Sequence, residues 1–175
     1  MENKTKSLSK NAFNYSIFIG LLLIVVSLLI YTFNLYDQSK LTSFISIAII
    51  IVGIILGTIN YRNNSLGGYI TYGKTFTSGL LIGLYSSIIV AVFTFLFYQF
   101  FAPEAINHLI EISEQAIVDK MPDITEEQLK SAMAIQSKFM TPVAMALMSI
   151  LTYTFWAAIF SLIIAAFVKK ENKSL

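Results

Sequence analysis

Apolar residues in this chain are gathered into long blocks that contain no charge. Four such blocks cover residues 11–36, 41–61, 75–103 and 139–168. A helix needs about 20 apolar residues to cross the hydrocarbon core of a bilayer, and every block is long enough. The pattern therefore predicts four transmembrane helices, at about residues 13–35, 42–60, 76–101 and 142–168.

The energetics of insertion favour the same interpretation. Twelve Ile, Leu, Val or Phe residues lie between Ile17 and Ile30, and together they contribute about −4 to −7 kcal/mol to insertion. A buried helix of a soluble protein would carry a polar face, which most of these segments lack. Only 13% of the residues are charged and 56% are hydrophobic, whereas soluble domains carry about 25% charged residues.

The segment between the third and fourth blocks, at about residues 104–140, has a different pattern. Two mainly apolar stripes recur there at helical spacing, so that the members of each stripe share one helix face. The first stripe is Ile106, Leu109, Ile110, Ser113 and Ile117, and the second is Leu129, Ala132, Met133, Gln136 and Met140. Thr125 and Gln128 match a capping box at the start of the second run. We therefore expect two amphipathic helices that form a hairpin.

The charge distribution predicts the orientation. With four crossings, both termini share one side, which receives eight basic residues (Lys4, Lys6, Lys10, Arg62, Lys74, Lys169, Lys170 and Lys173) and two acidic ones. The other side receives four lysines and eight acidic residues. Because basic residues collect on the cytoplasmic side, we expect the cytoplasmic (inner) membrane, cytoplasmic N- and C-termini and an extracytoplasmic hairpin. The hairpin carries seven acidic residues and three lysines, a net charge of −4. This acidic face is either simply solvated, or it attracts cations or a basic partner.

A polar connector of residues 60–76, "NYRNNSLGGYITYGKTF", follows the second block. Asn63 and Asn64, together with the glycines, are expected to break the helix. The candidate interfacial loop consists of Gly67, Gly68, Tyr69 and Tyr72, in which the tyrosines suit the headgroup layer. The alternatives are a plain interfacial connector and a re-entrant or ligand-binding loop.

Candidate chemistry is sparse. The chain has no cysteine and one histidine. Glu104, His108 and Glu111 share a helix face, but one histidine and two exposed glutamates make a poor metal site. No Asp, Glu, His or Lys lies within the blocks, which argues against proton-coupled transport and intramembrane hydrolysis. We therefore predict no catalytic residue, no metal site and no cofactor.

Small residues recur at the spacing that lets helix backbones approach. The candidates for helix packing are Gly53, Gly57, Gly79, Gly83, Ala157, Ser161 and Ala165. Packing within one chain and packing between copies are both compatible with this pattern.

Four motifs extend over nearly the whole chain: "NYSIFIGLL", "GGYITYGKTFTSGLL", "SKFMTPVAM" and "LIIAAFVKK". By these motifs the chain resembles an uncharacterised bacterial family of integral membrane proteins, domain of unknown function 4199. The resemblance implies the four-helix architecture. It brings no activity, cofactor or site residue.

The sequence thus predicts an all-α membrane protein with one integral membrane domain over residues 1–175. We expect a non-enzymatic structural or accessory subunit, with the lipid bilayer and a membrane-protein partner or homo-oligomer as partners. A net charge of +2 is too small to indicate nucleic acid. The alternative is a small channel or transporter with a polar path through Asn34, Thr94, Gln99 and the serines. An enzyme that acts at the outer surface through His108 is the third hypothesis.

Overall fold

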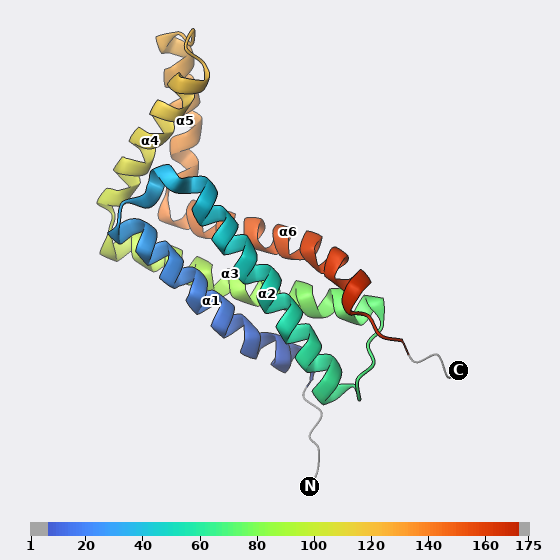
Figure 1. Ribbon diagram of the computed structural model, residues 1–175. Coiled ribbons are helices and arrows are strands. Elements are labelled where there is room, and N and C mark those ends of the chain that lie inside the picture. The colour runs from blue at the N-terminus through green and yellow to red at the C-terminus, as the bar shows by residue number, and fades with distance from the viewer. Residues whose placement is uncertain (1–6, 172–175) are drawn as a thin grey trace. The chain divides into compact units, whose positions relative to one another are not determined.

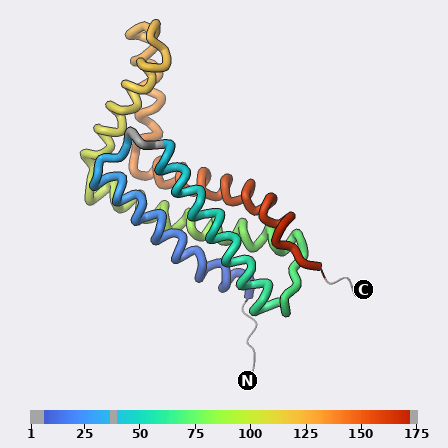
Figure 2. The backbone as a smooth tube through the Cα atoms, in the orientation of Figure 1, coloured from blue at the N-terminus to red at the C-terminus, as the bar shows by residue number. Residues whose placement is uncertain are grey.

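A computed structural model describes residues 7–171, with the backbone alone described at residues 37–39 (Figures 1 and 2). Lys4, Lys6 and Lys173, which enter the charge argument, lie outside the described residues. The elements are α1 (Leu8–Thr32), η1 (Leu35–Gln38), α2 (Ser39–Ser65), α3 (Tyr72–Leu96), η2 (Phe97–Phe101), α4 (Glu104–Lys120), α5 (Glu126–Phe139) and α6 (Pro142–Val168). The regular secondary structure of the described residues is therefore helical, apart from one isolated β-bridge between Ile70 and Lys170.

The chain divides into two compact units. The four-helix unit contains Met1–Val90 and Ile150–Leu175, and the hairpin unit contains Ala91–Ser149. The four-helix unit holds α1, α2, most of α3 and most of α6, which run alongside one another (Figure 1). The hairpin unit holds η2, α4, α5 and the adjoining ends of α3 and α6.

Four helices are long and apolar enough to cross a membrane, in agreement with the number predicted from the charge-free blocks. They comprise Leu8–Thr32, Lys40–Ser65, Tyr72–Phe101 and Pro142–Val168. Large apolar side chains face outward from the four-helix unit, among them Phe18, Phe44 and Phe167, which are 69%, 71% and 84% exposed. Such exposure is suited to lipid, because contiguous apolar surface of this kind is rare on soluble proteins.

Local chemistry shifts the ends of α1 relative to the expected range of 13–35. The helix begins at Leu8 because the side chain of Ser7 caps it by accepting a hydrogen bond from Lys10 N (3.3 Å). It ends at Thr32, before Asn34, whose φ of 51° lies in the left-handed region. Asparagine tolerates that region better than most residues and therefore permits the turn.

The predicted helix break at Asn63 and Asn64 is wrong. Both residues lie within α2, which continues to Ser65. The change of direction takes place at Gly67 and Gly68, whose φ angles are 64° and 91°. These left-handed conformations are readily adopted by glycine because it lacks a Cβ, so the glycines make the turn.

A π-helical segment follows α3. Residues Phe97–Phe101 form η2, and Ala102 N donates to Phe97 O at 2.9 Å, a bond of i to i−5 spacing. The ring of Phe97 is stacked on Phe93 and meets Tyr98 edge-on. The predicted range of 76–101 thus corresponds to an α-helix that widens over its last five residues.

Helices α4 and α5 pack against each other within the hairpin unit. All ten positions of the two predicted stripes are half-buried in the structure. The capping box is also present, because Gln128 N donates to the Thr125 hydroxyl (3.3 Å) and Thr125 N donates to the Gln128 side chain (3.1 Å). The helical period of the sequence therefore identifies the face that each helix turns inward.

Candidate functional site

Small residues bring α3 and α6 together inside the four-helix unit. A Cβ added to Gly79 would lie 2.9 Å from Ser161 Cβ, and one added to Gly83 would overlap Ala157 Cβ and approach Ala157 Cα at 3.5 Å. Ala157, Ser161 and Ala165 are all buried. Two of the glycine candidates therefore face two of the small residues that were predicted on the fourth span.

The other two candidate glycines contact large side chains. A Cβ on Gly53 would overlap the Ile19 side chain of α1. A Cβ on Gly57 would lie 2.6 Å from Ile82 Cδ1 and 3.0 Å from Tyr15 Cγ. In α2 the glycines thus provide hollows for branched and aromatic side chains of neighbouring helices.

Buried polar side chains reinforce the same helix contacts. Asn11 Nδ2 donates to Gly57 O at 2.8 Å, and the Ser16 hydroxyl donates to Ile82 O at 2.9 Å. Thr58 Oγ1 donates to Ser78 Oγ at 3.2 Å. These bonds join α1 to α2, α1 to α3 and α2 to α3. The polar groups of the apolar interior therefore form hydrogen bonds between packed helices.

Sequence reasoning missed Asn11, Ser16, Thr58 and Ser78 as interface residues. It selected glycines and alanines by their spacing and left most polar residues of the blocks unassigned. The signal was present, because an uncharged polar residue within an apolar span avoids lipid and turns toward another helix.

Ser161 differs from the other interior serines. Its side chain is 1% exposed, and among the described residues its Oγ is the buried side-chain polar atom that lacks a hydrogen-bond partner. It lies against Gly79 at the close contact of α3 and α6. An unsatisfied buried hydroxyl carries a desolvation cost, so this residue contributes shape rather than bonding.

The α2–α3 connector (residues 66–71) is clamped to the end of α6. Ile70 and Lys170 exchange two backbone hydrogen bonds, each 2.9 Å long. Arg62 Nη1 donates to Val168 O at 3.0 Å, which satisfies a carbonyl at the C-terminus of α6. We call this arrangement the connector clamp, and it holds the ends of α2, α3 and α6 in one place.

Three of the four loop candidates, Gly67, Gly68 and Tyr69, lie in the connector, and Tyr72 is the first residue of α3. Gly67 and Gly68 make the turn, and Gly68 N donates to Arg62 O at 2.9 Å. Tyr72 donates its phenol to Leu162 O at 3.0 Å. Tyr69 is 44% exposed, and the ammonium of Lys170 lies 5.7 Å from the centre of its ring.

A pocket of about 420 Å³ opens beside the connector clamp. Its polar lining consists of Tyr69, Thr71, Lys74, Lys170 and Glu171. Its apolar lining comes from Leu66 and Ile70. Two lysines and one glutamate therefore belong to the lining of this pocket, near the ends of three apolar helices.

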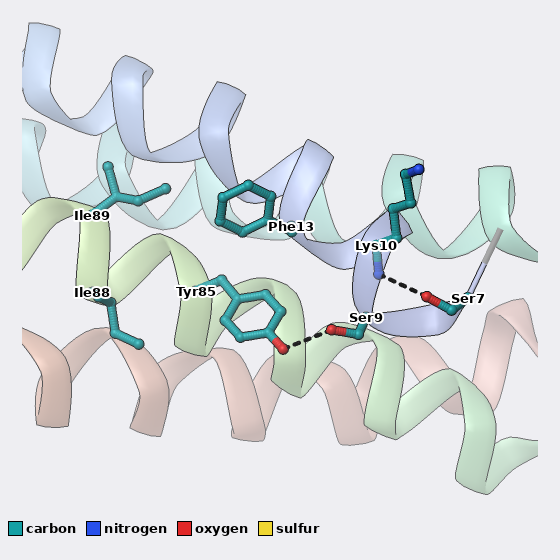
Figure 3. A pocket seen from close by; sticks show the side chains of 7 residues that line it. All are labelled: Ser7, Ser9, Lys10, Phe13, Tyr85, Ile88 and Ile89. Carbon is teal, nitrogen blue, oxygen red and sulfur yellow. Dashed lines mark hydrogen bonds between the residues drawn. The ribbon is translucent and has the colours of Figure 1, made fainter.

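A second pocket, of about 510 Å³, lies between the start of α1 and the middle of α3 (Figure 3). The Ser9 and Tyr85 hydroxyls form a 2.9 Å hydrogen bond across it, and the rings of Phe13 and Tyr85 meet edge-on with centroids 6.0 Å apart. The Lys10 ammonium points away from Tyr85 in Figure 3. The lining thus combines three apolar side chains with two serines, a lysine and a tyrosine.

The residues proposed for surface chemistry lie on α4. His108 Nδ1 is 3.8 Å from Glu111 Oε2, and both side chains are substantially exposed. Within residues 7–171, no group of three or more His, Cys, Asp or Glu side chains is placed to hold a metal ion. Of the candidates for a polar path, Asn34 and Gln99 are exposed and Thr94 is half-buried, whereas serines such as Ser16 and Ser86 take part in the interior hydrogen bonds.

The fold and these contacts define a class: a multi-pass helical membrane protein whose four apolar helices pack through small and polar residues. The chain belongs to the family described as Protein of unknown function (DUF4199), whose model matches residues 14–170. The match runs from α1 through Lys170 of the connector clamp. No curated protein and no solved structure matches the chain.

Proposed function

We propose that this protein is a non-enzymatic accessory subunit of the cytoplasmic membrane, with both termini inside and the α4–α5 hairpin outside as its contact surface. The orientation is supported by the basic residues around the ends of the helices, namely Arg62, Lys74, Lys169 and Lys170. The hairpin, by contrast, has a net charge of −4. Basic segments favour the cytoplasmic side, which leaves the acidic hairpin on the other.

The observation that carries the contact role is the incomplete burial of the hairpin. Ala105 is the one buried residue in α4, and α5 has none. Val118, Met121, Ile135 and Phe139 are 40–61% exposed. Two short helices with so little buried surface gain from a further partner that covers their apolar positions.

Charge favours a protein as that partner. The acidic polar face is repelled by anionic lipid headgroups, whereas it attracts a surface rich in lysine or arginine. We therefore assign to the hairpin a protein partner with an apolar groove and a basic rim.

Packing rather than transport accounts for the polar residues of the interior. The hydroxyls of Ser16 and Ser86 donate to backbone carbonyls, and that of Ser87 meets Thr154 Oγ1 at 3.1 Å. Hydrogen-bonded side chains of this kind stabilise helix contacts. They favour a structural role over the alternative of a channel or transporter.

Cysteine labelling tests the orientation, because the natural chain contains no cysteine. Ser131 is an exposed residue of α5, and Asn64 is an exposed residue near the end of α2. Each is replaced by cysteine, as Ser131→Cys and Asn64→Cys. In intact cells a membrane-impermeant maleimide should label Ser131→Cys, whereas Asn64→Cys should react only after permeabilisation. The reverse pattern would overturn the proposed topology.

Photo-crosslinking tests the contact role. A photoreactive residue at Ile135 should capture a discrete protein in native membranes, whereas one at exposed Gln115 should not. Charge sharpens the test, because Glu114→Gln with Asp119→Asn should lower the crosslinking yield and Lys130→Gln should raise it. A crosslinking yield that does not respond to any of the three charge changes contradicts the assignment. Co-purification of the captured protein with a variant that lacks residues 104–138 also contradicts it.

A further inference from the structure

The pocket beside the connector clamp has the chemistry of an anion site. Lys74 and Lys170 line it from different elements, one from the first turn of α3 and the other from the segment after α6. Thr71 and Tyr69 belong to the same lining. The side chains of two lysines and a threonine on the lining of one concavity can supply ammonium and hydroxyl donors to the oxygen atoms of a phosphate group.

The backbone around this pocket is fixed in place. Lys170 is held by the two 2.9 Å hydrogen bonds that it exchanges with Ile70, and Ile70 is 2% exposed. The Tyr69 ring lies 5.7 Å from the Lys170 ammonium. The backbone of Lys170 is therefore held in place before a ligand binds, which lowers the entropy lost on binding.

The level of the pocket along the helices selects the kind of anion. The apolar helix α2 ends at Ser65, α3 begins at Tyr72 and α6 ends at Val168, and the pocket lies where these ends meet. The ends of apolar spans mark the boundary of the hydrocarbon core. Phosphate groups of lipids lie at this level, and basic pockets between transmembrane helices bind lipid headgroups.

Glu171 also lines the pocket and opposes an anion. The two lysines outnumber it, so the lining keeps an excess of positive charge. The Arg62 guanidinium is engaged with Val168 O and the Asn63 side chain, at 3.0 and 3.1 Å. Lys74 and Lys170 are thus the groups that remain to bind an anion, and Glu171 moderates the affinity.

We propose that this pocket binds a phosphate group at the membrane boundary through Lys74 and Lys170. The phosphate is carried either by an anionic phospholipid or by a soluble phosphate compound. The inference is independent of the hairpin and of the direction in which the chain crosses the membrane.

Native mass spectrometry of the full chain in neutral detergent measures this binding. The protein is titrated with phosphatidylglycerol, with phosphatidylcholine of the same acyl chains, and with inorganic phosphate as competitor. We expect phosphatidylglycerol to bind more tightly than phosphatidylcholine. Lys74→Gln with Lys170→Gln should weaken it by about fivefold per lysine removed, whereas Lys130→Gln with Lys138→Gln in the hairpin should leave it unchanged.

Two further arms make the result decisive. Displacement of phosphatidylglycerol by millimolar phosphate assigns the site to soluble phosphate compounds, and resistance to displacement assigns it to the lipid. Glu171→Gln should tighten binding, and this single change leaves both lysines and the clamp in place. The proposal is overturned if the two lipids bind equally and inorganic phosphate displaces neither of them. It is also overturned if the double lysine variant binds as the wild type does while melting at the same temperature, or if Glu171→Gln has no effect.

Discussion

The four-helix unit and the α4–α5 hairpin bury their residues in different ways. In the four-helix unit, interior positions include eight polar residues that are nearly inaccessible, and large apolar side chains such as Phe167 face outward. In the hairpin, charged residues face outward and the apolar residues of the two stripes are half-buried, although Ile135 and Phe139 are exposed. The outer surface of the four-helix unit is thus less polar than its interior, whereas the outer surface of the hairpin is more polar than its inner faces.

Solvent explains this contrast. A helix surrounded by lipid gains nothing by hiding leucine, so small and polar residues determine which faces meet. A helix surrounded by water is oriented by its apolar stripe. Close contact at Gly83 and hydrogen bonding at Ser16 therefore stabilise the four-helix unit, whereas capping and amphipathic packing stabilise the hairpin.

The largest effect is expected at Gly83. Gly83→Ala places a methyl group on Ala157 Cβ, and because that atom is attached directly to the α6 backbone, α3 and α6 must separate. We expect a loss of about 2 kcal/mol in the free energy of unfolding, measured by denaturant titration in mixed micelles.

Two companion variants control this experiment. Gly73→Ala, in the same helix, adds a methyl group where no atom lies within 4 Å and should not destabilise the protein. Ala157→Gly should restore part of the stability that Gly83→Ala removes. Equal effects at Gly73 and Gly83 would contradict the close approach of α3 and α6.

The same contrast explains how much of the structure was predictable. The charge-free blocks reveal four spans because insertion depends on length and composition, and Leu129 and Met133 reveal the inner face of α5 by their period. Within the spans apolar residues occur on every face, so their periodicity does not predict which face of each helix turns toward the other helices. Gly79 and Gly83 were found by spacing, but their partners on α6 depend on how the helices align.

The candidate pocket was only partly predictable. The glycines and tyrosines of the connector indicated an interfacial loop, and Lys170 was recognised as a basic residue at the end of a span. Their meeting depends on the bridge between Ile70 and Lys170, which joins residues one hundred positions apart. Neither residue carries a local signal for that pairing.

A medium effect is expected at Thr125 in the hairpin. Thr125→Ala removes the hydroxyl that accepts from Gln128 N, and the loss of an N-cap costs about 1 kcal/mol. Amide hydrogen exchange should accelerate in α5 and stay unchanged in the interior of α1. Ser131→Ala, at an exposed position of the same helix, is the control, and acceleration of equal size there would argue against the capping box.

The smallest effects are expected for two serines of the interior, and they differ in sign. Ser16→Ala removes a hydroxyl whose single proton is shared between Ala12 O at 2.7 Å and Ile82 O at 2.9 Å. Both carbonyls lie within helices and accept backbone hydrogen bonds there, so neither is left without a partner. The lost interhelical bond should therefore cost only about 0.6 kcal/mol. Ser161→Ala removes a buried hydroxyl that has no partner in the described structure, and it should stabilise the protein by about 0.5 kcal/mol because an unsatisfied group is removed. Denaturant titrations of the two variants side by side measure the difference, and a loss of stability for Ser161→Ala as large as that for Ser16→Ala would show that hydrogen bonding does not distinguish these interior serines.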